Sequence, residues 1–412
     1  MRRPFAPRAE PRLIRARVGV FGYFATSGFV MGCWAAGLPA MDDRLRLGPG
    51  RLGTALLVIA FGALVSMLFV GRLSDRFTSR VVTRIAGPVS GMALLGPVLA
   101  PSYVTLVIFA AVYGVTVGFL EVAMNVNSVE VESRYGRPIV SAFHGLWSAG
   151  GAAGGALTSG LAHLRVGSQI ILIAAIVVAV ASFVYFGRML MPPPETHTAA
   201  STAEGSTGLS LRWGIVLILG ILAFSGHISE GAAIDWASVH AHRVLLVPLD
   251  NAPIAYTVFG TAMTLVRLAG DPIRGRLGPA RTLLTAGACA TVGYAVVLAS
   301  PLAGSIAFGV ACAGWMLTGI GLATVVPVVM SAVGSFGGAV GKALSTVTAF
   351  SSTGMLVGPA VIGHLAQATS LPVALVVPAT LAAVVAVIGP FAIRALRAVP
   401  ARAAAVEAAA AP

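Results

Sequence analysis

Acidic and amide side chains stand inside a long apolar stretch of this sequence. In "VTVGFLEVAMNVNSVE", residues 115–130, Glu121 is surrounded by apolar residues and Asn125 follows about one helical turn later. An ionised carboxylate in hydrocarbon costs several kcal/mol, so such residues are rare and are typical of proton relays and solute pathways. Gly114 and Gly118 fall on the same helical stripe as Glu121, which brings a neighbouring helix or a cavity close to the carboxylate.

Two roles for Glu121 are compatible with this pattern. Its carboxyl group can load and release a proton as its surroundings alternate between wet and dry, as carboxylates in transporters do. Alternatively, it is a structural group that is hydrogen-bonded to Asn125 or to a Ser or Thr of the next helix. The first role predicts that Glu121→Gln abolishes uphill accumulation of a solute and leaves its exchange across the membrane intact.

A second polar cluster occurs in "FSGHISEGAAIDWAS", residues 224–238. His227 and Glu230 are i, i+3 neighbours on a helix and can share a proton or a hydrogen bond. Asp235 lies about 140° round a helix from Glu230. All three can therefore face one site only if the helix is broken, which the two glycines of this stretch permit. Alternatively, Asp235 and Trp236 mark the outer membrane interface.

Aromatic residues complete the set of candidates. His144 and Trp147, in "SAFHGLWSAGG", share one helical face and can stack on a sugar or an aromatic ring, or fill space. The candidates for proton handling are Glu121 and Glu230, and those for solute binding are Asn125, His144, Trp147, His227, Asp235 and, more weakly, Trp34. The spacing of His227, Glu230 and Asp235 matches no known ligand pattern, so we expect no metal.

Apolar runs of membrane-spanning length must position these residues. The chain of 412 residues is 57% hydrophobic and only 10% charged, against roughly 25% charged residues in soluble domains. Too few charges remain to coat a large soluble core. A bilayer needs about 20 apolar residues per helix, and twelve such runs occur at 17–40, 52–71, 81–100, 104–127, 138–163, 169–190, 213–239, 253–271, 282–300, 304–330, 343–366 and 371–395.

The basic residues are distributed unevenly between the two sides of the predicted membrane. If the N-terminus is cytoplasmic, the cytoplasmic segments hold 22 of the 27 basic residues, as the positive-inside rule requires. We therefore expect a multi-pass protein of the cell inner membrane with both termini in the cytoplasm, and we exclude a nucleic-acid partner. The basic start precedes an apolar run too long for a signal peptide, so we expect a retained first helix.

Other chemistries lack their motifs. The sequence has no phosphate-binding loop, no Gly-x-Ser-x-Gly elbow, no CxxC and no HExxH. The three cysteines lie in apolar runs and form no disulfide or metal pattern. We expect no enzyme activity and no cofactor. The expected partners are the lipid bilayer, a small-molecule substrate and protons, and we expect a monomer.

The chain divides into two halves around a polar segment. "MPPPETHTAASTAEGSTGLSLR", residues 191–212, reads as a flexible cytoplasmic linker between six-helix bundles at 1–190 and 213–412. "SAGGAAGGALTSGLA" aligns with "STGMLVGPAVIGHLA" at an offset of 204 residues, which favours a parallel six-plus-six repeat. The glycines of these stretches permit sliding where the halves meet, or static close packing.

A short charged segment joins the second and third runs. "GRLSDRFTSR" has the spacing G-x-L-x-D-R-x-x-x-R and an echo in "VRLAGDPIRGRLGPAR". This pattern resembles the loop signature of the major facilitator superfamily, although Thr78 replaces its second glycine. The resemblance implies two pseudo-symmetric six-helix bundles and a cytoplasmic gate made by Gly71, Asp75, Arg76, Arg80 and Asp271. Alternatively, these charges serve only as topology signals.

The string "GFLEVAMN" resembles the fucose-permease branch of that superfamily, where the corresponding glutamate takes part in proton-coupled sugar uptake. The first run contains no acid, although that branch uses one there. "AMNVNSVEVESRYGRPIVSAFHGLWSAGG" also resembles bacterial transporters of uncertain substrate. The sequence thus predicts proton-coupled uptake of a sugar-like or other small polar solute. Proton-driven efflux of a drug or metabolite is the alternative, and a membrane sensor or scaffold without transport is an alternative of another class.

Overall fold

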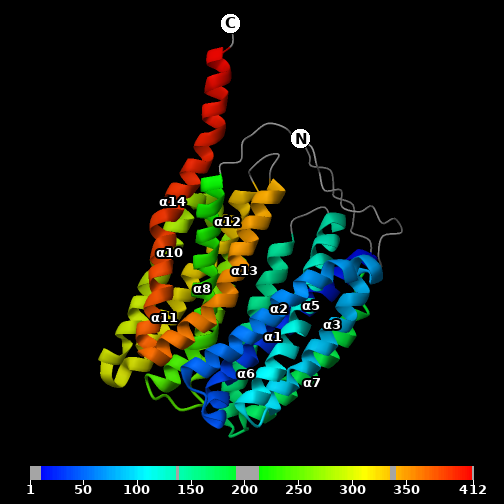
Figure 1. Ribbon diagram of the computed structural model, residues 1–412, viewed down its shortest axis with the longest axis vertical. Helices are drawn as coiled ribbons and strands as arrows, with labels where there is room; N and C mark the ends of the chain where they lie inside the picture. The colour runs from blue at the N-terminus through cyan, green and yellow to red at the C-terminus, as the bar shows by residue number, and fades with distance from the viewer. Residues whose placement is uncertain (1–10, 136–138, 192–212, 335–339, 411–412) are drawn as a thin grey trace. The chain divides into compact units, whose positions relative to one another are not determined.

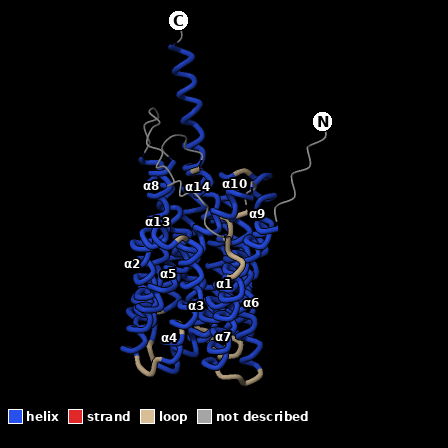
Figure 2. The backbone as a smooth tube through the Cα atoms, turned by 90° about the vertical axis from the view of Figure 1, so that its right-hand side faces the viewer, coloured by secondary structure: helices blue, strands red, loops and turns tan. Residues whose placement is uncertain are grey.

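The computed structural model describes residues 11–135, 139–191, 213–334 and 340–410. The side chains of some helical residues inside these ranges, among them 70–76 and 270–274, lie outside the description. Within the described chain every regular element is a helix (Figure 2). An all-helical arrangement satisfies each backbone group inside its own segment, which lipid demands because it offers no hydrogen bonds.

Figure 1 shows the helices in their order along the chain. They are α1 (Pro11–Leu45), α2 (Gly48–Phe77), α3 (Ser79–Ala93), α4 (Leu95–Leu99), α5 (Tyr103–Tyr135), α6 (Val140–His163), α7 (Ser168–Gly187), α8 (Trp213–Arg243), α9 (Pro253–Leu277), α10 (Pro279–Ala299), the 3-10 helix η1 (Ser300–Ile306), α11 (Ala307–Leu322), α12 (Val325–Val333), α13 (Val340–Ala368) and α14 (Leu371–Ala410).

Each of the twelve predicted runs corresponds to helix, and two of the runs are interrupted. The third run is divided into α3 and α4, and the tenth into α11 and α12. Both interruptions come just before a proline, Pro97 in α4 and Pro327 in α12. Proline lacks the backbone N–H that would bond the carbonyl four residues earlier, so the helix breaks at that point.

The helices are long and apolar enough for a membrane. Nine helical stretches of the described chain meet this standard, and one of them, Pro279–Val333, spans α10 to α12. Large apolar side chains are exposed along many of these helices, for example Val104, Ile170 and Val387. Such exposure would be costly in water, and it is the expected outer surface of helices that face lipid.

The chain forms two compact units. The first contains residues 1–45 and 58–197, and the second contains residues 46–57 and 198–412. Residues 46–57 belong to the second unit, where Gly53 lies against backbone atoms of Pro359 and Gly363. Residues 192–212 lie outside the described residues, so the predicted linker and the domain boundaries drawn around it stay a prediction.

Helix packing follows the same plan inside each unit. In the first unit α1 packs against α6 and α7, and α3 packs against α5 and α7. In the second unit α8 packs against α13 and α14, and α10 packs against α11 and α14. The two sets of neighbours correspond one to one in chain order, as a parallel six-plus-six repeat requires.

The repeat extends to the turns that follow α2 and α9. Thr78 alone separates α2 from α3, with φ of 69°, and Gly278 alone separates α9 from α10, with φ of 73°. A positive φ suits glycine and strains a β-branched residue. Thr78 therefore adopts the backbone conformation that a glycine has in the other unit.

Candidate functional site

Glu121 lies in the middle of α5, on the side that approaches α2. A Cβ atom placed on Gly114 would lie 2.2 Å from the carbonyl oxygen of Ile59, and one placed on Gly118 would lie 2.1 Å from the hydroxyl of Ser66. No larger residue fits at these two glycines without a shift, so α2 and α5 pack with their backbones close together. The predicted glycine stripe thus places a neighbouring helix beside Glu121.

Glu121 is half-buried in this structure. Among the described residues, no hydrogen bond or ion pair to its carboxylate is found. The amide of Asn125 donates to the main-chain oxygen of Glu121 at 2.8 Å, not to the carboxylate. The alternative in which Asn125 holds the carboxylate in a structural role therefore finds no support, since Asn125 bonds within its own helix.

Tyr113 and Trp34 lie near this acid in the first unit. Tyr113 is close enough to Glu121 to interact with its charge, and its ring lies 6.3 Å from that of Trp34, centroid to centroid. Trp34 is only 3% exposed. Burial of that extent favours packing for Trp34.

His144 and Trp147 lie on α6 next to α1. His144 is exposed and meets the ring of Phe24 edge-on at 5.1 Å. Trp147 is half-buried, and its main-chain oxygen lies against Gly28, where a Cβ would meet it at 1.9 Å. Of the two aromatic candidates, His144 is thus the more accessible to a solute.

An ion pair joins α8 to α9 in the second unit. The guanidinium of Arg267 donates to the Glu230 carboxylate at 2.9 Å, and the two side chains are 15% and 8% exposed. Charges can be buried when they are paired and hydrogen-bonded in this way. Glu230, a predicted proton carrier, thus has a cation partner that Glu121 lacks among the described residues.

The ion pair belongs to a larger polar cluster. The ring of His227 is hydrogen-bonded to the hydroxyl of Ser351, from α13. His227 also interacts with the charges of both Glu230 and Arg267. The hydroxyl of Tyr294, from α10, donates to the main-chain oxygen of Ser229. Four helices therefore converge on one buried polar centre, which can offer hydrogen-bond donors and acceptors to a polar solute.

Sequence reasoning missed part of this centre. Arg267 was counted with the cytoplasmic basic residues, whereas the structure pairs it with Glu230 inside the helical bundle. The signal was available, because Arg267 falls within the predicted run 253–271 and a charge inside such a run marks a functional position. Ser351 and Tyr294 carried no comparable signal, since single hydroxyls are common in apolar helices.

Asp235 lies apart from this centre, because the helix break that the two glycines would permit does not occur. α8 runs uninterrupted from Trp213 to Arg243, so Asp235 points about 140° away from Glu230. Asp235 is 7% exposed, with no hydrogen bond or ion pair found to it among the described residues. Trp236 is fully buried, and it therefore cannot anchor this end of the helix at an interface as the alternative supposed.

Most residues of the predicted cytoplasmic gate cannot be placed. The side chains of Gly71, Asp75, Arg76 and Asp271 lie outside the described residues. Arg80 is described, is half-buried, and has a buried Nε atom for which no partner is found within the described chain. The backbone is helical through Phe77, so the expected loop is reduced to the single residue Thr78.

The glycine-rich helices pack within their own units. A Cβ on Gly150 or on Gly154 would lie 2.2 Å from a backbone oxygen of α1. A Cβ on Gly354 would lie 2.6 Å from the backbone oxygen of Phe224 in α8, and one on Gly358 would lie 3.6 Å from Ile228. Static close packing, one of the two interpretations given above, therefore accounts for these glycines.

Metal ligation finds no support among the described side chains. No group of three or more His, Cys, Asp or Glu residues in that part of the chain is placed to hold a metal ion. Cys33, Cys289 and Cys312 are free thiols that are buried or half-buried. The arrangement can thus bind and exchange protons and form hydrogen bonds, and these are the chemical means that the described side chains offer.

Comparisons with known proteins agree with this architecture. A family model described as Major Facilitator Superfamily matches residues 20–335. The uncharacterized transporter y4wD of Sinorhizobium fredii (strain NBRC 101917 / NGR234) is 32% identical over 385 residues, which are 92% of this chain and 98% of that protein. An uncharacterized MFS-type transporter of Yersinia pestis is 33% identical over 353 residues, 85% of this chain and 89% of its own.

A solved structure shows the same fold. The crystal structure of a D-xylose-proton symporter superposes with a TM-score of 0.71 at 15% sequence identity, and the match covers 90% of this chain and 97% of that one. The predicted fold class, an all-helical membrane protein with twelve transmembrane helices in two six-helix bundles, is confirmed.

Proposed function

Because the chain belongs to the Major Facilitator Superfamily, we propose that it moves a small polar solute across the membrane by alternating access, with protons as the coupling ion. The chain is a multi-pass membrane transporter of that family. The nature of the solute and of the coupling ion forms the proposal, and both are argued from the described side chains of the two units.

The observation that carries proton coupling is the carboxylate of Glu121, for which no partner is found among the described residues. A charge in a low-dielectric environment is costly unless a partner or water compensates it. Protonation removes the charge and with it this cost. A carboxylate that is wet in one conformation and dry in the other can therefore carry a proton across one step of the cycle.

The polar centre of the second unit supports a polar solute. Glu230 and Arg267 neutralise one another, so the centre carries donors and acceptors without a large net charge. Such a surface suits the hydroxyl groups of a sugar-like molecule, with His227 and Ser351 as further hydrogen-bonding groups. The D-xylose-proton symporter shares the fold, and a sugar is therefore the first solute class to test.

Reconstitution into liposomes with an imposed pH gradient tests the proposal directly. Labelled sugars and amphipathic drugs are presented in turn, and both solute accumulation and internal pH are followed. We expect a sugar to accumulate uphill and to carry protons with it. Uphill movement of a drug in the opposite direction would instead establish efflux. A solute that binds without crossing the bilayer would overturn transport and favour a sensor.

The variant Glu121→Gln distinguishes proton coupling from movement of the solute itself. This variant keeps the shape of the side chain and loses its titration, so gradient-driven accumulation should fall to the level of empty liposomes while exchange of labelled for unlabelled solute continues. Asp250→Asn, a similar acid-to-amide change in the connection between α8 and α9, is the matched control and should behave as wild type. Normal uphill accumulation by Glu121→Gln would refute proton coupling through this residue.

The membrane and its orientation complete the proposal. We place the protein in the cell inner membrane as a monomer with both termini in the cytoplasm, because 21 of its 27 basic residues, Arg267 no longer among them, would then lie on the cytoplasmic side. Labelling of single exposed cysteines with an impermeant reagent in whole cells tests this orientation. Labelling at position 165, between α6 and α7, but not at position 188, after α7, is expected.

A further inference from the structure

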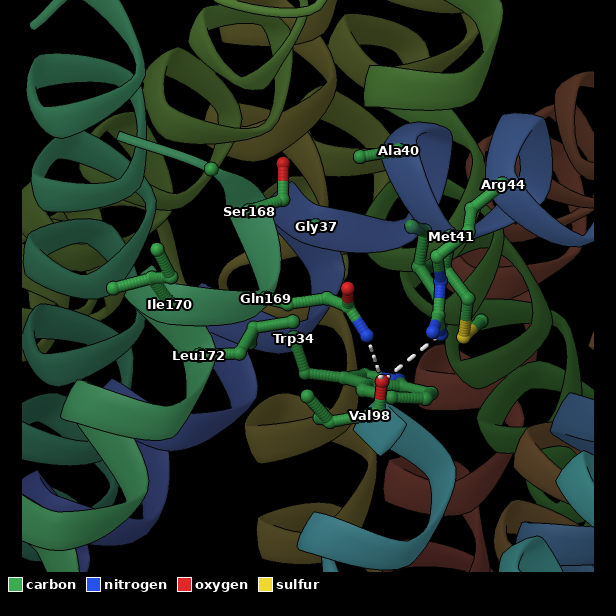
Figure 3. Close-up of a pocket in the computed structure, with 12 residues that line it drawn as sticks. Trp34, Gly37, Ala40, Met41, Arg44, Val98, Ser168, Gln169, Ile170 and Leu172 are labelled. Atoms are coloured by element: carbon green, nitrogen blue, oxygen red, sulfur yellow. Dashed lines mark hydrogen bonds between the residues drawn. The ribbon is translucent and has the colours of Figure 1, made fainter. Parts of the chain in front are cut away.

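A cavity of about 300 Å³ lies within the first unit, at the end where α1 stops and α7 starts (Figure 3). Its wall is formed by α1, by the end of α4 and by the first turns of α7. A volume of this size holds about ten water molecules at roughly 30 Å³ each, and it is at the lower limit of small-molecule pockets. With the orientation proposed above, the cavity lies at the outer face of the membrane.

The floor of the cavity is apolar. Trp34, Leu38, Met41 and Leu172 line it, and each of these side chains is less than a tenth exposed. Val98 of α4 also lines the cavity and is 2% exposed. Burying the apolar part of a ligand against these side chains releases water and gains roughly 25 cal/mol for each Å² of apolar surface.

The rim of the cavity is polar and positively charged. Arg44 is exposed at the mouth, and Ser168 and Gln169 are half-buried beside it. The Arg44 guanidinium donates to the main-chain oxygen of Val98 at 2.9 Å, and the Gln169 amide donates to the same oxygen at 3.0 Å (Figure 3). These bonds fix both side chains at the mouth, while the guanidinium keeps further N–H groups for a ligand.

The start of α7 adds to the positive potential at this rim. Gly167 precedes the helix in an extended conformation, and no side chain caps the first turn. The backbone N–H groups of a first helical turn carry partial positive charge and favour an anion. None of the twelve described residues that line the cavity is acidic. Asp42 and Asp43, next to Arg44 in the sequence, do not line it.

From the apolar floor and the cationic rim together, we propose that this cavity binds a small amphipathic anion, with its carboxylate or phosphate at Arg44 and its apolar body against Trp34. Charge-assisted bonds from a guanidinium to an anionic oxygen are about twice as strong as neutral ones, and they select an anion over an alcohol of the same shape. Neither Glu121 nor any residue of the polar centre of the second unit lines this cavity. Binding to it can therefore be measured without transport.

Saturable binding of labelled octanoate to the protein in phosphatidylcholine nanodiscs tests the proposal, with empty nanodiscs giving the background of simple partitioning. Unlabelled octanoate should displace the label at about a tenth of the concentration that octanol needs. Equal displacement by octanoate and octanol would overturn the proposal, because the rim would then not recognise charge.

Substitutions at Arg44 and Ala40 test whether the ligand binds in the cavity. Arg44→Gln should remove the preference for octanoate over octanol, and Arg44→Lys should keep part of it. Arg165→Gln, in the connection that leads to α7, is the matched control and should keep the full preference. Ala40→Phe fills the cavity without touching its charge and should abolish saturable binding. An octanoate preference that persists in folded Arg44→Gln, or saturable binding that persists in Ala40→Phe, refutes the assignment.

Changing the lipid of the nanodiscs distinguishes a lipid headgroup from a soluble anion as the ligand of the cavity. If a phosphate headgroup of the bilayer occupies the cavity, nanodiscs that contain phosphatidylglycerol should weaken octanoate binding to wild type by about tenfold, as expected for a competitor present in excess. If the site serves soluble anions, the affinity for octanoate should be the same in both kinds of nanodisc.

Discussion

The two units each hold a glutamate within a membrane-crossing helix, and they treat it differently. Glu230 in the second unit is paired with Arg267 and lies beside the hydrogen-bonded His227. Glu121 in the first unit has its main-chain oxygen bonded to Asn125, and no partner for its carboxylate is found among the described residues. The same residue type is thus one half of an ion pair in one unit, and in the other an acid with no partner found within the described part of the chain.

This difference predicts that one glutamate contributes mainly to stability and the other mainly to proton chemistry. A buried ion pair holds two helices in register, and removing one member leaves the other charge uncompensated. An acid for which no partner is found among the described residues contributes little to stability, and such acids in membrane helices commonly take up and release protons. This contrast favours Glu121 over Glu230 for the proposed coupling role, and both roles stay predictions.

The largest expected effect tests the ion pair. Glu230→Gln removes the carboxylate that accepts from Arg267 at 2.9 Å, and breaking this buried ion pair should lower the free energy of unfolding by about 3–5 kcal/mol. Glu121→Gln, the matched change in the other unit, should lower it by less than about 1 kcal/mol. Unfolding in detergent by a chemical denaturant measures both. The double variant Glu230→Gln/Arg267→Met should recover most of the loss, and equal losses in the two single variants would remove the contrast between the units.

An intermediate effect is expected at equivalent glycines. Gly154→Ala places a Cβ 2.2 Å from the backbone oxygen of Phe29, so α1 and α6 must move apart, at a cost of about 1–3 kcal/mol. Gly358→Ala places its Cβ 3.6 Å from Ile228, an ordinary contact. This variant should be neutral, or more stable by up to about 1 kcal/mol, because alanine favours a helix. Thermal unfolding of both purified variants measures the change in stability. A larger loss for Gly154→Ala would show that α1 and α6 pack more tightly than α8 and α13.

The smallest effect concerns the turns after α2 and α9. Thr78→Gly relieves a positive φ, and it also removes a buried hydroxyl for which no partner is found within the described chain. It should stabilise the protein by about 1 kcal/mol. Gly278→Thr introduces the same strain in the other unit, where a Cβ meets no atom within 4 Å, and should destabilise by about 1–2 kcal/mol. Changes of opposite sign in the free energy of unfolding of the two variants would confirm that the two turns are equivalent. Changes of the same sign would contradict it.

Sequence patterns predicted the helices better than the contacts of the polar residues. The twelve helical runs could be predicted because the hydrophobic thickness of a bilayer fixes the length of each helix. The pairing of Glu230 with Arg267 could not be predicted, since it depends on how α8 and α9 are rotated relative to each other. Two glycines permit a break in α8, but the helix is continuous and packs against α13 and α14.

The sequence by itself determined that this is an all-helical membrane protein built from two related halves, because apolar length and charge asymmetry are properties of the chain alone. Only the tertiary structure decided which polar side chains meet. It paired Glu230 with Arg267, left Asn125 bonded within α5, and brought Arg44, Gln169 and Val98 together around a cavity. Contacts between residues far apart in the chain follow from the rotation and spacing of packed helices, which no local pattern specifies.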